Sequence, residues 1–198
     1  MKKLTFVLAV VAGLAFAFKP AELKMKLDAS KSKVMWFAEK VTGKHNGGIT
    51  VKSGDVILKD GNLTGGTFVM DMTSISCADL EGEWNQKLVG HLKSDDFFSV
   101  EKNPTSTFTI TKVAALAGDK AGNTHTISGK MTIKGITNEI SFPAKVGVTA
   151  DAITAKGKAV LDRTKWDIKY GSKSFFESIG DKAIYDEFTI EFDVTAKK

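Results

Sequence analysis

The stretch Glu187-Phe188-Thr189-Ile190-Glu191-Phe192-Asp193-Val194 alternates polar and apolar residues over its whole length. Successive side chains of a β-strand point to opposite faces, so this pattern predicts a strand with one buried face and one wet face. Three earlier stretches show the same alternation. Their apolar members are Phe68, Met70 and Met72, then Phe108 and Ile110, and then Met131 and Ile133.

Clusters rich in Gly, Asn and Asp separate these stretches at residues 44–48, 59–62, 118–123 and 135–138. Short alternating strands between such turn signals are typical of an antiparallel sandwich or barrel. The sequence has three prolines and no Ser/Gly/Pro-rich linker. We therefore expect a single all-β domain over residues 18–198.

The N-terminal residues predict a secretory signal peptide. Lys2 and Lys3 form a charged start, residues 4–16 are apolar, and Ala15-Phe16-Ala17 has the small-x-small cleavage pattern. Cleavage after Ala17 would make residues 1–17 the signal peptide and would place the protein in the periplasm or outside the cell. The apolar run is too short for a comfortable bilayer crossing, and the polar outer faces of the strands are unsuited to lipid. No stable membrane insertion is expected.

Charge and cysteine content exclude further classes. Two of the positive charges in the net +5 belong to the signal peptide, which leaves +3 on residues 18–198. The lysines are scattered, without the concentrated basic stripe of a nucleic-acid-binding protein. Cys77 is the one cysteine, so it excludes an internal disulfide and a cysteine-cluster zinc site. We expect a buried, inert thiol.

Two segments break the strand pattern. Leu80, Trp84, Leu88 and Leu92 recur every four residues, which predicts a helix with Ser76 or Asp79 as its cap, lying over the barrel or closing one mouth. Residues 170–180 are irregular. They contain the adjacent Phe175 and Phe176, which we expect to pack onto something apolar.

The sequence lacks a recognisable catalytic or metal-binding motif. His45, His91 and His125 are far apart, and we expect the first and last to be exposed in turns. His91 is predicted to hydrogen-bond a carbonyl at the end of the helix. We therefore expect no catalysis and no cofactor, although convergence of distant residues stays open at this point.

The predicted inner face is rich in Phe and Met, and the sequence has 13 Phe against 2 Tyr. Such side chains either fill a barrel or line a ligand cavity, and composition leaves both alternatives open. Each buried CH₂ group is worth ~0.8 kcal/mol, so a long isoprenoid tail could bind tightly without polar contacts.

Three motifs carry a family resemblance. Residues 91–98 (HLKSDDFF), 104–108 (PTSTF) and 129–137 (GKMTIKGIT) resemble the YceI-like family in order and spacing, and the likeness extends over residues 27–194. It implies an extended lipocalin-like antiparallel β-barrel of about eight strands with one or two short helices. It also implies export and non-catalytic binding of a polyisoprenoid, an isoprenoid quinone or a related lipid inside the barrel. A homodimer is left open.

The sequence departs from the family pattern at two places. Lys40-Val41 stands where family members often carry His, and Asp167 stands where the late strand 161–168 is expected to have Gly. The predicted ligand-binding set combines the motifs with the apolar faces. It comprises Trp36, Phe68, Met70, Met72, Trp84, Leu88, Leu92, Phe97, Phe98, Phe108, Ile110, Met131, Ile133, Phe142, Trp166, Phe175 and Phe176.

Two other functions compete with a lipid carrier. A stress or interaction protein would have a filled barrel and an exposed patch around Trp84 or Phe175 and Phe176. An enzyme acting on an amphiphile would have a His or carboxylate with a perturbed pKa at the barrel mouth.

Overall fold

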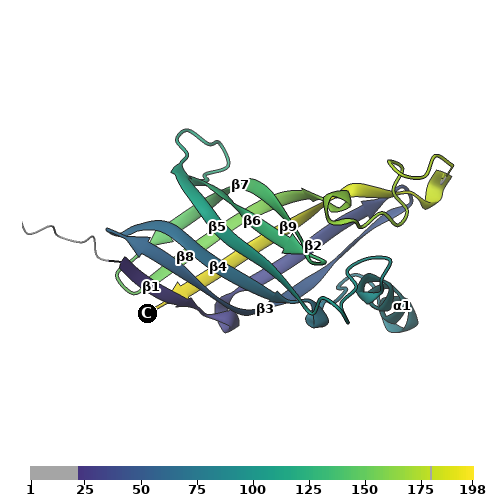
Figure 1. Cartoon of the computed structure of the whole chain (residues 1–198), viewed down its shortest axis with the longest axis horizontal. Coiled ribbons are helices and arrows are strands. Elements are labelled where there is room, and N and C mark those ends of the chain that lie inside the picture. Colours follow the sequence, from purple (N-terminus) through teal and green to yellow (C-terminus); the bar gives the residue numbers. More distant parts are fainter. Residues whose placement is uncertain (1–21, 179) are drawn as a thin grey trace, which may run out of the picture.

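The computed structural model describes residues 22–178 and 180–198, and over these it shows nine strands and one α-helix (Figure 1). The predicted signal peptide, residues 1–17, lies outside the described residues and stays a prediction. The strands are β1 (Glu22–Leu27), β2 (Lys33–Lys40), β3 (Gly43–Lys59), β4 (Asn62–Asp71), β5 (Thr105–Ala115), β6 (His125–Ile133), β7 (Ile136–Val148), β8 (Ala152–Asp162) and β9 (Ile184–Lys197). The helix is α1 (Gly82–Lys93), and 3₁₀ turns form η1 (Ala29–Lys31), η2 (Met72–Ser74), η3 (Arg163–Trp166) and η4 (Gly180–Lys182).

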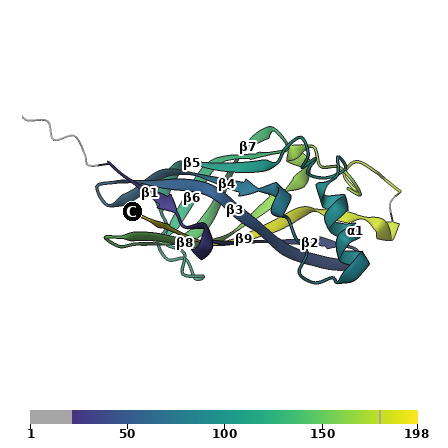
Figure 2. The ribbon, with the colours of Figure 1, turned by 90° about the horizontal axis from the view of Figure 1, so that it is seen from below.

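The strands close into an antiparallel barrel with eight strand positions. β1 and β2 share one position, because residues 22–26 of β1 pair with residues 55–59 of β3 while residues 34–40 of β2 pair with residues 43–49 of the same strand. Both also pair with β9, and β3 pairs with β4, which completes the ring. The barrel is long and narrow (Figures 1 and 2). The prediction of about eight strands and a short helix is confirmed, and the sandwich alternative is excluded.

The alternation of residues 187–194 sets the inner face of β9 as predicted. Phe188, Ile190, Phe192 and Val194 all line the barrel interior. β9 is hydrogen-bonded to β2 and β8 along most of its length. Because a slip of one residue would turn every apolar side chain outward, pairing on both sides fixes the register.

The turn predicted at residues 44–48 is wrong. These residues lie inside β3, and the chain reverses at Val41 and Thr42 instead. Gly47 serves a close approach of backbone, because a Cβ there would lie 1.7 Å from the Ser76 carbonyl oxygen. The segment after η2 runs along β3 at this point, and Ser76 N–H donates to the Gly48 carbonyl at 3.0 Å. Gly47 therefore marks the point in β3 where another segment of the chain lies directly against the strand backbone.

The predicted helix forms, but neither predicted cap residue caps it. α1 begins at Gly82 and is preceded by Glu81, which makes no side-chain capping hydrogen bond. The side chains of Ser76 and Asp79 bind β3 instead: the Gly48 N–H donates to the Ser76 hydroxyl, and the Asn46 N–H donates to the Asp79 carboxylate.

The late strand predicted over residues 161–168 ends earlier than expected. β8 stops at Asp162, and η3 follows. Asp167 then adopts a left-handed conformation with φ 59°. Glycine occupies such positions without strain and Asp is among the residues that tolerate them, which explains why a glycine was expected here.

Candidate functional site

A cavity of about 190 Å³ runs along the barrel interior. Its wall includes members of both buried clusters of the protein. One cluster lies beside α1 and includes Leu92 and Phe97, and the other includes Leu63 and Ile127. The strands alternate, so each contributes every second side chain to this single interior.

Four phenylalanines on different strands form a continuous aromatic band in the wall. Ring centroids are 6.4 Å apart for Phe68 and Phe108, 5.3 Å for Phe108 and Phe142, and 5.4 Å for Phe142 and Phe192. These rings come from β4, β5, β7 and β9. Tilted and edge-on rings at such distances attract one another and present a smooth apolar surface.

Two strand glycines make room for this band. A Cβ at Gly129 of β6 would lie 2.6 Å from the Phe108 ring, and one at Gly157 of β8 would lie 2.8 Å from the Phe192 ring. Each glycine therefore lets a ring from a neighbouring strand lie across its backbone. Phe68 and Phe108 lie opposite each other on paired strands, whereas the other two contacts of the band reach across β6 and β8.

One charged side chain, Arg163, lies in the wall, and it is 5 % exposed. Its Nη1 donates to the carbonyls of Ile168 and Tyr170 at 2.9 and 2.8 Å. Nε donates to the Tyr185 carbonyl at 3.1 Å, and Nη2 donates to the Ile184 carbonyl and to the Asp186 carboxylate at 3.1 and 3.2 Å. Five N–H donors meet five acceptors, so the guanidinium is engaged within the protein.

Burial lowers the pKa of the Arg163 guanidinium, while the negative charges of Asp186 and Asp162 oppose this. An arginine stays charged across the physiological range despite such a shift. The carboxylate of Asp186 also accepts from the Ser174 hydroxyl at 2.6 Å. Arg163 therefore ties η3, residues 168–170 and the start of β9 together.

Histidine and aromatic rings join α1 to the segment after η3. The His91 ring lies 4.9 Å from the Phe97 ring and 4.6 Å from the Tyr170 ring, nearly edge-on to both. Phe97 lines the cavity. Residues 170–178 lie at the same end of the molecule as α1 (Figures 1 and 2). This cluster therefore covers part of that end of the barrel.

Most of the predicted ligand-binding residues lie together in the cavity wall. Those that line it are Trp36, Phe68, Met70, Met72, Leu92, Phe97, Phe98, Phe108, Ile110, Met131, Ile133 and Phe142. Ligand contact by these residues stays a prediction. Sequence reasoning did not include Arg163 or Ser106, which also line the wall. Ser106 shares the inner face of β5 with Phe108 and Ile110, two and four residues further on, and that period of two was the signal that could have found it.

Five predicted residues lie away from the cavity. Trp84 is 70 % exposed on the outer face of α1, and Leu88 packs beside the cluster of buried residues next to the helix. Trp166 is 1 % exposed, and its Nε1 donates to the Met131 carbonyl at 3.1 Å. Phe175 and Phe176 are about half exposed, so the prediction that they pack onto an apolar surface is wrong.

All three histidine predictions need correction. His45 is half-buried in β3, 2.8 Å from the Asp79 carboxylate, and His125 is half-buried at the start of β6, 2.8 Å from the Thr124 hydroxyl. His91 contacts the Asp96 carboxylate at 3.1 Å, whereas the Ser94 hydroxyl donates to the carbonyl near the helix end. Cys77 is buried as predicted. It belongs to a group with His45 and Asp79 that the sequence gave no reason to assemble.

A closed antiparallel barrel with an apolar interior and a helix at one end defines a lipocalin-like protein. The chain belongs to the YceI-like family, because the model of the YceI-like domain matches residues 25–196. The resemblance seen in the sequence motifs is thereby confirmed.

The curated relatives match over one short segment. A UPF0312 protein of Pseudomonas aeruginosa is 45% identical over 56 residues, which are 28% of this chain and 27% of the relative. A UPF0312 protein of Pectobacterium atrosepticum is 38% identical over 56 residues, with the same shares. The match spans about a quarter of the length of these relatives.

Solved structures resemble nearly the whole chain. Burkholderia cenocepacia BcnA has a TM-score of 0.67 at 22% identity, covering 86% of this chain and 99% of its own. A polyisoprenoid binding domain from Saccharophagus degradans has a TM-score of 0.63 at 14% identity, covering 90% and 99%. The YCEI protein of Campylobacter jejuni has a TM-score of 0.52 at 16% identity, covering 100% and 99%. At these identities the likeness shows the fold alone.

In the described part of the chain, no helix combines the length and the hydropathy that a membrane crossing requires.

Proposed function

We propose that this protein binds a polyisoprenoid, an isoprenoid quinone or a related lipid inside the barrel and serves as an exported carrier or buffer. The observation that carries the proposal is the cavity, whose wall is apolar along the barrel. The S. degradans neighbour described as a polyisoprenoid binding domain has the same fold, which supports this choice of ligand. Export rests on the predicted signal peptide.

The shape of the cavity favours a slender ligand. A volume of about 190 Å³ distributed along a long barrel suits an extended chain better than a bulky ring system. Each buried CH₂ group contributes ~0.8 kcal/mol, so a few isoprene units suffice for firm binding. Among the residues that the structure describes, Ser106 is the one serine or threonine in the wall, and it can donate a hydrogen bond to an oxygen of the ligand.

The same wall supports binding without catalysis. Its charged member, Arg163, has its donors occupied by carbonyls and by Asp186. General acid–base chemistry needs a titratable group within hydrogen-bond reach of the substrate. The lining residues within the described part of the chain include neither His nor Asp nor Glu. We therefore propose a binding protein and not an enzyme that acts on an amphiphile.

Native mass spectrometry of the protein purified from its own cells, followed by organic extraction, tests the proposal. A bound lipid of defined mass is the expected result. The apo protein is then titrated with an isoprenoid quinone. A clean apo mass together with no uptake of quinone would contradict the proposal.

A pair of matched variants ties the uptake to the cavity. Ala159 lines the wall and is 5 % exposed, whereas its neighbour Val160 points outward and is 61 % exposed. Ala159→Phe should fill part of the cavity and reduce quinone uptake at least ~10-fold, a loss of about 1.4 kcal/mol. Val160→Phe should leave uptake unchanged. Equal uptake by both variants would place the ligand elsewhere.

A second candidate function is an interaction protein with a surface binding patch. The observation that favours it is the exposure of Trp84 at 70 % and of Phe175 and Phe176 at 49 % and 50 %. Exposed aromatic side chains are common anchors of protein interfaces. If the purified protein has a clean apo mass and Trp84→Ala with Phe175→Ala abolishes a specific partner complex, this second function replaces the first.

A further inference from the structure

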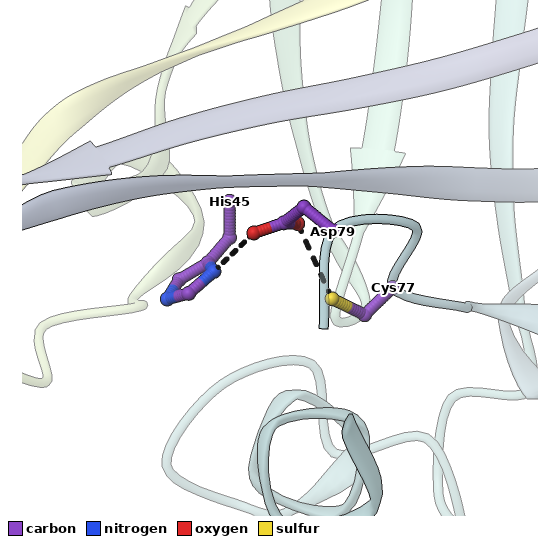
Figure 3. A group of neighbouring side chains, drawn as sticks. All are labelled: His45, Cys77 and Asp79. Carbon is purple, nitrogen blue, oxygen red and sulfur yellow. Dashed lines mark hydrogen bonds and ion pairs between the residues drawn. The ribbon is translucent and has the colours of Figure 1, made fainter. Parts of the chain in front are cut away.

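A three-residue group of metal-binding side chains lies outside the cavity. Residues 76–81, which precede α1, run along residues 45–48 of β3 and are held there by backbone hydrogen bonds. Ser76 N–H donates to the Gly48 carbonyl at 3.0 Å, and Ala78 N–H donates to the Asn46 carbonyl at 2.8 Å. This path places Cys77 and Asp79 beside His45 of β3 (Figure 3).

The three side chains converge closely. His45 Nδ1 lies 2.8 Å from Asp79 Oδ2, and Cys77 Sγ lies 3.3 Å from Asp79 Oδ1. The three ligand atoms lie within 4.8 Å of one another. Around a tetrahedral ion with bonds of ~2.0–2.3 Å, ligand atoms are ~3.3–3.7 Å apart, so small side-chain rotations would seat an ion.

This order of contacts is unsuited to a cysteine nucleophile. Figure 3 shows the Asp79 carboxylate between the thiol and the imidazole. A nucleophilic cysteine needs the imidazole beside its sulfur as the base, with the carboxylate on the far side of the ring. Cys77 is also buried. Metal binding uses the three groups without requiring that order.

We infer that His45, Cys77 and Asp79 form a binding site for a divalent transition-metal ion, with Zn²⁺ favoured by the ligand set. Thiolate, imidazole and carboxylate are the three ligand types that zinc takes in proteins. Three protein ligands would leave a fourth position for water. None of the three residues lines the barrel cavity, so the site is separate from the proposed lipid site.

The carboxylate is ready to accept a cation. Although burial alone would raise its pKa, hydrogen bonds from the Asn46 N–H, His45 and Cys77 outweigh this and hold the pKa of Asp79 below its usual value. The Asn46 N–H donates to Oδ1 at 2.8 Å and fixes the carboxylate orientation. Such outer hydrogen bonds orient metal ligands and strengthen binding.

Metal binding at this site has a defined proton balance. A thiol must lose its proton to become a ligand, so one proton leaves Cys77 for solvent per ion bound. The ion would take Nδ1 of His45, while Nε2 points away from Asp79 in Figure 3. Apparent affinity should therefore rise with pH.

A bound ion would attach residues 76–81, which precede α1, to the barrel. The Cys77 carbonyl accepts from Asn85 of α1 at 2.9 Å. The Ser76 carbonyl accepts from Nε1 of Trp36 at 2.9 Å, and Trp36 belongs to the cavity wall. Loss of the ion would weaken the attachment of residues 76–81 to β3. Metal binding is thus expected to raise the thermal stability of the protein.

Titration of the full metal-stripped chain with Co²⁺ tests the inference. Co²⁺ replaces zinc in such sites, and a thiolate ligand gives it a near-ultraviolet sulfur-to-cobalt absorption band. We expect that band at one ion per chain, reversed by added Zn²⁺ and accompanied by proton release. Absence of the band, or a band without proton release, would overturn the inference.

Three variants and a matched control complete the test. Cys77→Ser should abolish the band, while His45→Gln and Asp79→Asn should weaken Co²⁺ binding by at least the ~10- to 100-fold that loss of an outer hydrogen-bond partner costs a metal site. Asp96→Asn removes the carboxylate of the other histidine–aspartate pair, at His91, which has no cysteine, and should change nothing. Circular dichroism of each variant confirms folding. Unchanged binding in both His45→Gln and Asp79→Asn would show that the thiol binds cobalt alone.

Discussion

The wall of the barrel and the segments that cover one of its ends respond differently to the same kind of sequence pattern. In β9, apolar residues at every second position all face the interior. In α1, apolar residues at every fourth position diverge, since Leu92 is 9 % exposed and Trp84 is 70 % exposed. A regular apolar repeat therefore predicts burial in the wall better than in the covering segments.

The difference arises from the number of neighbours that hold each element. A barrel strand is hydrogen-bonded on both sides, which leaves it one inner face. Only the C-terminal part of α1 packs against the barrel, where Leu92 lines the cavity and His91 contacts Phe97 and Tyr170. Trp84, in the first turn of α1, is left exposed by all the described elements.

The largest expected loss of stability comes from placing a charge in the cavity wall. Phe108→Asp removes two ring contacts and buries a carboxylate, so we expect a loss of more than ~4 kcal/mol, enough to unfold a domain of ordinary stability. Thr109→Asp, one residue along and exposed, should change stability by less than ~0.5 kcal/mol. Urea denaturation of both variants measures the difference. Similar stabilities for the two would disprove the assigned faces.

A somewhat smaller loss of stability is expected at Arg163, where the cavity wall joins residues 168–170 and the start of β9. Arg163→Met removes the charge partner of Asp186 and the side-chain donor to the carbonyls of Ile168, Tyr170, Ile184 and Tyr185. Breaking a buried charged pair of this kind costs ~3–5 kcal/mol. Arg163→Lys keeps the charge but offers only three donors. Its stability should therefore lie between that of Arg163→Met and that of the original protein. Thermal unfolding measures both, and a lysine variant as stable as the original protein would show that charge alone suffices.

Alanine substitutions in α1 sharpen the comparison within one element. Leu92→Ala removes a buried side chain and should cost about 2 kcal/mol or more, because large-to-small changes leave a cavity. Trp84→Ala should cost less than ~0.5 kcal/mol despite the larger side chain, because it is exposed. Chemical denaturation of both variants measures this. A larger loss for Trp84→Ala would mean that another surface covers the first turn of α1.

The smallest expected effect is the pH dependence of the stability that the contact between residues 76–81 and β3 provides. The pKa of Asp79 is held below its usual value, so its charge stabilises the folded state above the unfolded pKa of ~3.9. That contribution is lost as the pH falls through the folded pKa. Asp79→Asn should therefore be less stable than the original protein near pH 6, and the gap should narrow on acidification below pH ~4. Denaturation in the presence of a chelator measures the gap, and a constant gap would rule out the charge as its source.

The sequence predicted the wall because its signals are local. Alternation over residues 187–194 and at Phe68, Phe108 and Met131 is set by neighbours along the chain, and the three family motifs fixed the order of the elements. The aromatic band, by contrast, needs Gly129 and Gly157 on intervening strands. Those glycines gave only a weak signal because strand pairing is not visible along the chain.

The sequence by itself determined the class of fold, the inner faces of the strands and most of the cavity wall, because a period of two in paired strands has one outcome. Only the tertiary structure decided which apolar residues of α1 are covered, why Gly47 must lack a Cβ, and how His45 comes to face Cys77 and Asp79. These features depend on where residues 76–81 lie against β3. The physical reason is that such a contact joins residues more than thirty positions apart, and no periodicity along the chain encodes it.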